Sequence, residues 1–153
     1  MNLEALAAFL EAANKATYAN RTMPKAPSTR AGSLDYHFER DGLAYHDTYF
    51  GARDFIGAEV VYDNGTPAWG MNYFGFILDD GVSEKDVYAF LRTALMQPYG
   101  DLIPVRGPRR FDEGGKSFRL AIAGDLANFT GTEEIHFASK VVYRCHIHGG
   151  LIR

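Results

Sequence analysis

The stretch Phe55-Ile56-Gly57-Ala58-Glu59 decides the fold, because its pattern returns as Phe129-Thr130-Gly131-Thr132-Glu133, 74 positions later. The same spacing aligns further aromatic residues and glycines downstream, namely Trp69 with Tyr143 and Gly75 with Gly149. Internal self-similarity is typical of a chain built from repeated structural units. We therefore interpret residues 1–153 as one domain that contains two copies of one unit, about residues 3–75 and 84–149.

Each copy is expected to contain one helix followed by four strands. Apolar residues at helical spacing predict a helix over residues 3–16 and a second helix that begins at Ser83 and ends before Pro98. Alternating apolar and polar residues predict strands over 34–40, 43–50, 55–63, 66–75, 109–112, 116–124, 129–138 and 140–149. The predicted class is α+β: duplicated α-β-β-β-β units whose antiparallel sheets pack about a pseudo-twofold axis, with one helix covering a face of each.

Turns and loops are expected between these helices and strands. Asp41-Gly42, Asn64-Gly65 and Gly114-Gly115 are dipeptides that suit tight hairpins, because such turns need positive φ. Two proline-containing segments, 19–33 and 98–110, follow the helices and are expected to be loops. Loops of that length are often functional or mobile.

Composition excludes several classes of protein. The formal net charge is -3 and there is no basic stripe, so we expect no nucleic-acid partner for this chain. No apolar stretch approaches the roughly 20 residues needed to span a bilayer, so no membrane partner is expected. Cys145 is the only cysteine, which excludes an internal disulfide and is typical of a reducing, cytoplasmic location. The sequence gives no indication of the oligomeric state.

The two copies differ on the face that is expected to be buried. Side chains alternate across a strand, so each strand divides into two faces. The inward face of the second copy is apolar except for Glu133. At the equivalent positions, the first copy carries carboxylates and hydroxyls among its aromatic residues. Tyr45, Asp47, Tyr49, Glu59, Trp69, Met71 and Tyr73 make up this polar and aromatic face.

Two interpretations of the inward glutamates remain open, because a buried carboxylate is unfavourable unless it is paired. In the first, Glu59 and Glu133 have a structural role: each accepts hydrogen bonds from loop N–H groups, or pairs with an arginine from the Arg106, Arg109 and Arg110 loop or from the Arg30 loop. In the second, Glu59 belongs to a ligand-binding cavity with the other polar and aromatic residues of the first copy. Polar groups that converge within an aromatic-lined concavity are typical of small-molecule sites.

Metal and cofactor sites are not expected. His146 and His148 lie on one strand face and His136 on the neighbouring strand, which is a spacing seen in zinc sites. Arg144 shares that face, however, and its charge opposes a cation. The sequence also contains no phosphate-binding or dinucleotide-binding glycine motif. We therefore expect solvated histidines, no metal and no cofactor.

Several motifs together resemble a known family. They are Tyr49-Phe50-Gly51, Trp69-Gly70-Met71-Asn72-Tyr73, Arg106-Gly107-Pro108 and His148-Gly149-Gly150-Leu151. The chain resembles a bacterial family filed as a domain of unknown function, whose members are sometimes fused to helix-turn-helix transcriptional regulators of the XRE type. The resemblance implies a sensing or ligand-binding role by association and implies no catalytic residues.

Three functional hypotheses follow. The first is a sensor-like domain that binds a small molecule without catalysis, in which Glu59 and Asp47 recognise a cationic or hydroxylated ligand. The second is an enzyme that uses Glu59 or Asp47 as a general base, because burial can bring a carboxyl pKa close to the working pH. The third is a protein-protein interaction module that docks through an exposed sheet edge or face.

Overall fold

A computed structural model describes residues 2–100 and 106–153 of the chain. Residues 101–105 of the loop expected over 98–110 lie outside the described residues. The order of elements is a helix, four strands, a helix and four strands: α1 Leu3–Ala16, β1 Leu34–Arg40, β2 Leu43–Gly51, β3 Phe55–Asp63, β4 Thr66–Ile77, α2 Glu84–Leu95, β5 Arg110–Glu113, β6 Lys116–Asp125, β7 Asn128–Phe137 and β8 Lys140–Leu151.

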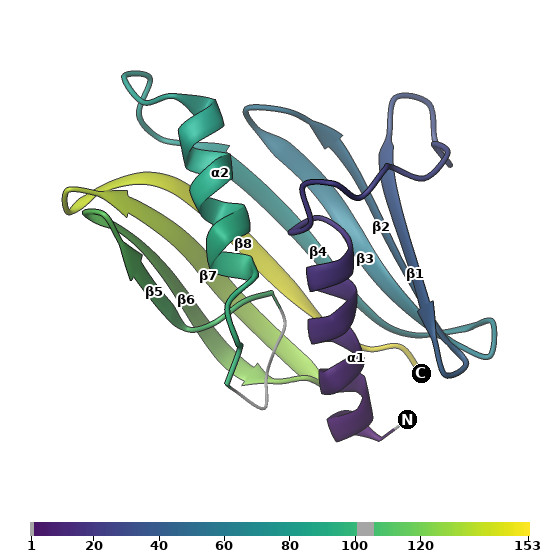
Figure 1. The fold of residues 1–153 in the computed structure, drawn as a ribbon. Coiled ribbons are helices and arrows are strands. Elements are labelled where there is room, and N and C mark those ends of the chain that lie inside the picture. The colour runs from purple at the N-terminus through teal and green to yellow at the C-terminus, as the bar shows by residue number, and fades with distance from the viewer. Residues whose placement is uncertain (1, 101–105) are drawn as a thin grey trace.

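The eight strands form a single antiparallel sheet in the order β1-β2-β3-β4-β8-β7-β6-β5. The two strand sets meet where β4 pairs with β8, with Tyr73 opposite Ile147. Both helices lie over the same face of this sheet (Figure 1). The prediction of more than one sheet is therefore wrong. The reason is that the last strand of each set has a free edge, and these two edges hydrogen-bond to each other.

The helices are defined by their caps and their apolar faces. Asn2 caps α1 by accepting hydrogen bonds from the backbone N–H groups of Glu4 and Ala5, and Ser83 caps α2 by accepting one from Asp86. Their buried residues recur at helical spacing, as in Leu6, Phe9, Leu10 and Ala13 of α1. No helix in the described ranges is long and apolar enough to cross a bilayer.

The expected turns are present, and one further turn has a less obvious sequence. Asp41-Gly42, Asn64-Gly65 and Gly114-Gly115 all have positive φ, as tight hairpins require. Ala138-Ser139 joins β7 to β8 with φ of 46° and 70°. Alanine and serine rarely adopt this conformation, so the sequence alone gives no turn signal there.

The core fills the layer between the helices and the sheet. Its largest fully buried side chains include Trp69, Tyr45, Tyr143, Phe118 and Phe129. The expected inward face of the second strand set is confirmed at Phe118, Leu120, Phe129, Ile135, Tyr143, Cys145 and Ile147, all of which are buried. Apolar side chains reach the other face of the sheet as well, where Ile56 and Phe74 are exposed.

A phenylalanine packs against a glycine on the neighbouring strand in both strand sets. Phe55 on β3 is opposite Gly75 on β4, and Phe129 on β7 is opposite Gly149 on β8. A Cβ atom at Gly75 would lie 2.3 Å from Cζ of Phe55, and one at Gly149 would lie 2.9 Å from Cζ of Phe129. These glycines therefore provide the space in which the two rings lie.

Gly75→Ala is expected to destabilise the protein by roughly 1–3 kcal/mol, because the buried Phe55 ring must move out of its present position. Gly70→Ala on the same strand should cost less, since its nearest neighbour is the Glu59 carbonyl oxygen at 3.3 Å. Denaturant unfolding of both variants measures the difference. Equal losses would contradict this account of the glycine.

Candidate functional site

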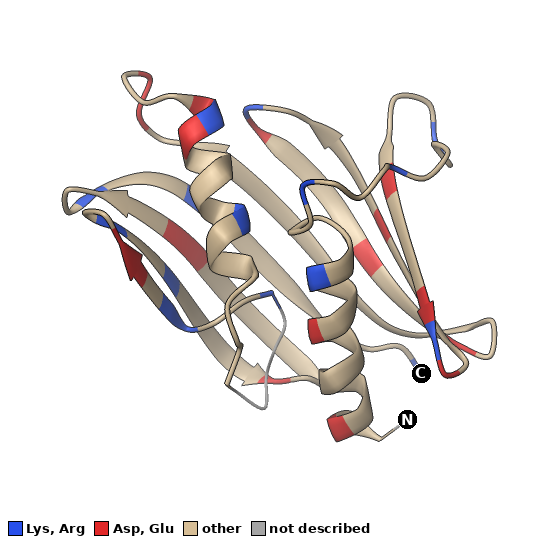
Figure 2. Cartoon of the chain, viewed as in Figure 1, with Lys and Arg blue, Asp and Glu red and all other residues tan. Residues whose placement is uncertain are grey.

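One arginine pairs with the two glutamates that the sequence analysis singled out. Arg106 Nε donates to Glu133 Oε2 at 3.1 Å, and Arg106 Nη1 donates to Glu59 Oε1 at 3.4 Å. All three side chains are buried, with 6% of Arg106, 2% of Glu59 and none of Glu133 exposed. Glu59 is on β3 and Glu133 on β7, so the arginine joins the two strand sets; Figure 2 shows acidic positions within both. The expectation of an arginine partner from this loop is confirmed.

Tyrosine hydroxyls complete the cluster. The Tyr143 hydroxyl donates to Glu133 Oε1 at 2.8 Å, and the Tyr73 hydroxyl donates to Asp47 Oδ1 at 2.5 Å. Asp47 is opposite Glu59 across the β2–β3 ladder, so three buried carboxyl groups lie near one guanidinium. One positive charge cannot balance three ionised carboxylates, which favours the protonated form of at least one of them.

The pKa values of Asp47 and Glu59 are shifted because carboxyl groups outnumber positive charges in this cluster. Burial raises the pKa of the Asp47 carboxyl to about 6, although its hydrogen bond from Tyr73 and the charge of Arg106 oppose the rise. Burial and the neighbouring charge of Asp47 raise the pKa of Glu59 to about 8, again against Arg106. Glu59 Oε2 is buried without a hydrogen-bond partner among the described residues, which also favours the neutral form.

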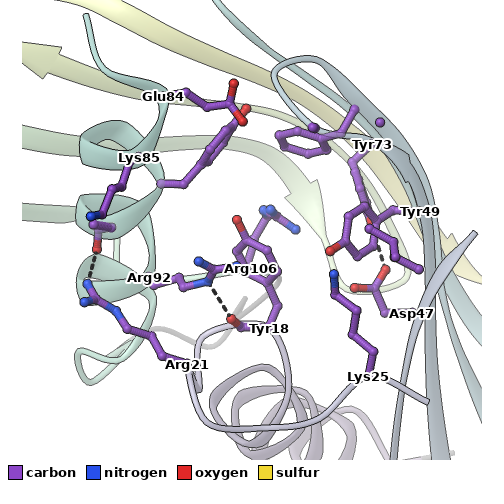
Figure 3. A pocket seen from close by; sticks show the side chains of 16 residues that line it. Tyr18, Arg21, Lys25, Asp47, Tyr49, Tyr73, Glu84, Lys85, Arg92 and Arg106 are labelled. Atoms are coloured by element: carbon purple, nitrogen blue, oxygen red, sulfur yellow. Dashed lines mark hydrogen bonds between the residues drawn. The ribbon is translucent and has the colours of Figure 1, made fainter.

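A pocket of about 600 Å³ lies beside this cluster, between α2 and the strands β1 to β4. Asp47, Tyr73 and Arg106 line it, so the pocket and the buried cluster share three residues. Its size falls within the usual range for small-molecule sites, about 300–1,000 Å³. Figure 3 shows the side chains of Asp47 and Tyr49 on one side and those of Lys85 and Arg92 on the other.

Aromatic rings form much of the wall of this pocket. They are Tyr18, Tyr49, Phe55, Tyr73 and Tyr88. Tyr49 packs edge-on against Tyr18, with 6.5 Å between ring centroids, and Phe55 contacts both Tyr73 and Tyr88. Burial raises the pKa of the Tyr18 hydroxyl to about 12, so this hydroxyl stays protonated at neutral pH and can donate a hydrogen bond.

Two arginines hold Tyr18 at the centre of the pocket. Arg92 Nε donates to the Tyr18 carbonyl oxygen at 3.2 Å, and its guanidinium lies 4.7 Å from the centre of the Tyr18 ring. The guanidinium of Arg106 lies 5.0 Å from the Tyr73 ring centre and 5.9 Å from that of Tyr18. Cation-π contacts of this kind tie the aromatic wall to the buried ion pair.

The segment after α1 supplies further polar residues, and Asp35 fixes its far end. Ser33, Thr29 and Thr48 donate hydroxyl hydrogen bonds to the buried Asp35 carboxylate, and His46 Nε2 lies 2.7 Å from it. The backbone N–H of Ala26 also bonds the Asp35 carbonyl oxygen. This anchor holds the segment on which Lys25 and Arg21 reach the pocket.

The structure divides the seven residues proposed from the sequence into two groups. Asp47, Tyr49 and Tyr73 line the pocket. Tyr45, Glu59, Trp69 and Met71 are buried in the core and do not line it. Trp69 stacks on Phe129 and donates its indole N–H to the Leu126 carbonyl oxygen at 3.0 Å, which makes it a core residue rather than a wall of this pocket.

Sequence reasoning missed the residues that come from the α1–β1 segment and from α2. They are Tyr18, Arg21, Lys25, Glu84, Lys85, Tyr88 and Arg92. Tyr88 and Arg92 are four positions apart on α2, so they share one helix face, and this spacing was a usable signal. The strands that this face of α2 contacts depend on the β4–β8 pairing. The strand pattern alone does not specify that pairing.

The histidines of the second strand set lie outside this site. His146 and His148 are exposed and His136 is half-buried beside Glu134. In the described ranges, no three histidine, cysteine, aspartate or glutamate side chains are grouped as metal ligands.

Comparison with known proteins gives one match. A family model described as "Domain of unknown function (DUF5680)" matches residues 47–152, which is more than half of the chain. Neither the curated proteins nor the solved structures yield a match. The matched range contains Asp47, Tyr73 and Arg106, whereas Tyr18 and Lys25 precede it.

Arg106→Met is expected to destabilise the protein by about 3–5 kcal/mol, because removing one partner of a buried ion pair leaves the others unpaired. Adding Glu133→Gln to this variant should recover part of the loss, since the uncompensated carboxylate is then removed. Thermal or denaturant unfolding of the single and double variants measures both effects. A double variant that is less stable than Arg106→Met would contradict the pairing.

Stability is expected to fall as the pH rises from about 4.5 to about 8. The pKa of Glu59 is raised on folding, so its contribution to stability is fully present below the unfolded-state pKa and is lost as the pH rises through about 8. Glu59→Gln should flatten this dependence, because glutamine has no proton to lose. Melting temperatures across the pH range test it, and equal slopes for both proteins would exclude Glu59 as the source.

Proposed function

We propose that this chain, which belongs to the DUF5680 family of proteins with a domain of unknown function, is a small-molecule-binding domain. The pocket beside Asp47 and Arg106 would be its site. The observation that carries the proposal is the combination of an aromatic-walled cavity of about 600 Å³ with a few convergent polar groups. Small-molecule sites generally have this composition.

The proposed contacts fall into two classes. Tyr18, Tyr49 and Phe55 offer ring faces and edges to a planar ligand, since aromatic side chains contribute large apolar contact areas. Asp47 and Tyr73 offer a hydrogen-bonding pair at the sheet end of the pocket. Tyr45, Glu59, Trp69 and Met71 are buried in the core and do not line the pocket, so they would not contact the ligand directly.

A second candidate function is catalysis with Asp47 as a general base. The specific observation in its favour is that Asp47 lines the pocket while burial brings its pKa to about 6, close to neutral pH. Glu59 is less suited to this role, because it does not line the pocket and Arg106 contacts it. Chemical turnover of a bound compound would distinguish this candidate from binding alone.

A sensing role is the most economical form of the binding proposal. The resemblance to proteins that are sometimes fused to helix-turn-helix regulators favours a domain that reports the presence of a metabolite. The buried Arg106 ion pair would link ligand binding to the fold, because Arg106 lines the pocket and joins both strand sets.

We also infer that the two halves of the domain descend from a duplicated unit. Tyr73 and Ile147 are 74 positions apart, and they pair directly with each other across β4 and β8. An axis of twofold symmetry at this pair would relate β4 to β8. The matching Phe55–Gly75 and Phe129–Gly149 contacts support the same relation. Ile147 occupies in the second half the position that Tyr73 occupies in the first. The second half therefore has no hydroxyl group there, and only the first half would keep a polar site.

The binding proposal is tested by filling the pocket. Ala52 is exposed and lines the pocket, so Ala52→Trp should block binding without disturbing the core. A ligand present at 100 times its Kd stabilises a protein by about 2.7 kcal/mol, which corresponds to a rise of several degrees in melting temperature for a chain of this length. Compounds that stabilise the wild-type protein in a thermal-shift screen should therefore fail to stabilise Ala52→Trp.

Ala31→Trp is the matched control, because Ala31 is also an exposed loop alanine but does not line the pocket. It should respond to ligands like the wild-type protein. Compounds that stabilise Ala52→Trp as strongly as Ala31→Trp would place their binding elsewhere and would refute this site.

A further inference from the structure

We propose that the ligand of this pocket is a small organic anion, with its acid group against Arg92 and its ring between the tyrosines. This inference rests on the proposed binding function and specifies the charge of the ligand. The sequence had suggested a cationic or hydroxylated ligand, on the assumption that Glu59 and Asp47 both face it. The residues that line the pocket favour a ligand of the opposite charge.

Basic side chains outnumber acidic ones around the pocket. Among the described residues, five basic ones line it and only Asp47 and Glu84 are acidic; the basic residues are Arg21, Lys25, Lys85, Arg92 and Arg106. Figure 2 shows basic positions on α2 and on the segment that follows α1. The chain as a whole has a formal net charge of -3, so the pocket concentrates positive charge within an acidic protein. A cleft lined by one sign of charge attracts ligands of the other sign.

Within residues 2–100 and 106–153, four of these basic groups have no acidic partner. Arg106 is already engaged in the buried cluster, where it pairs with Glu133 and donates a hydrogen bond to Glu59. Among the ion pairs of the described residues, none involves Arg21, Lys25, Lys85 or Arg92. Arg21 and Arg92 do donate hydrogen bonds to backbone carbonyl oxygens, which orient their guanidinium groups without cancelling the charge.

Arg92 is the best placed of these groups to bind an acid. Its Nε is used by the Tyr18 carbonyl oxygen, and its ring contact with Tyr18 holds the guanidinium plane in place. This arrangement leaves the terminal nitrogens of Arg92 for a ligand, and a guanidinium can bind a carboxylate through two parallel hydrogen bonds. Figure 3 shows Lys25 on the opposite side of the pocket, on the side of Asp47 and Tyr49, where its charge adds to the positive charge of the cleft.

The sheet end of the pocket suits a neutral polar group of the ligand. Asp47 and Tyr73 already share a hydrogen bond there. A hydroxyl group of the ligand would donate a further hydrogen bond to the Asp47 carboxylate. The ligand class is therefore a planar or aromatic acid that carries a hydroxyl group at its far end.

A set of three compounds with the same hydroxylated ring and side-chain groups of different charge tests this inference. 4-Hydroxyphenylacetate, 4-hydroxyphenylacetamide and tyramine share a hydroxylated ring and carry charges of -1, 0 and +1. Isothermal titration calorimetry at low salt should show that the acid binds at least about tenfold more tightly than the amide, and that tyramine binds most weakly. Added salt should reduce this preference, because it screens exposed charges.

Variants assign the effect to individual residues. Arg92→Gln should lower the affinity for the acid about tenfold and leave the affinity for the amide nearly unchanged. Lys25→Gln should act in the same direction; Lys25 is exposed, so this variant carries little risk to folding. Arg40→Gln removes an exposed charge outside the pocket and should change neither affinity.

The possible outcomes separate the two proposals. If tyramine or the amide binds as tightly as the acid, and Ala52→Trp abolishes that binding, then the charge inference is wrong and the binding site stands. If none of the three compounds binds at millimolar concentration, both the charge inference and the proposed binding function are refuted for ligands of this size and shape. Preference for the acid that survives both Arg92→Gln and Lys25→Gln would also overturn the inference.

Discussion

The buried contact of Arg106 with Glu59 and Glu133 is the interaction on which the rest of the structure depends. The two glutamates come from strands at equivalent places in the two strand sets, and a single guanidinium reaches both. Without the Arg106 guanidinium, the carboxyl groups of Glu59 and Glu133 would lie in an apolar layer with too few hydrogen-bond donors. The arginine follows α2 in the chain, so the same contact also fixes where the segment beyond this helix returns to the sheet.

The buried ion pair of Arg106 and the pocket belong to one network of contacts. Arg106 contacts the ring of Tyr73, Tyr73 donates to Asp47, and Asp47 lines the pocket. A charged ligand in the pocket would therefore contact Asp47 and Tyr73, whose protonation depends on the nearby ion pair of Arg106. Buried polar networks of this kind are costly when they are only partly satisfied, which makes them sensitive to small changes.

Much of the fold could be predicted because local patterns specify it. The glycine dipeptides identified three hairpins, and the alternation around Phe129 and Ile135 identified the buried face. The pairing of β4 with β8 could not be predicted, because either free edge can form hydrogen bonds with any other strand. For the site, the excess of polar residues in the first strand set pointed to Asp47, Tyr49 and Tyr73, which line one pocket. Arg92 and Lys25 were missed, since their approach to Asp47 follows from tertiary packing and not from any local spacing.

The β4–β8 pairing has a consequence for how the chain reaches its folded state. Every other strand pair in the sheet joins neighbours in sequence, so those ladders close short loops. Trp69 and Leu151 form the most distant pair in the β4–β8 ladder, and closing a loop of that size has a high entropic cost. We expect the two meanders to form early and their union to be the slow event in folding. Until then each meander exposes an unpaired edge strand, so this stage is the one at which the protein is most prone to aggregate.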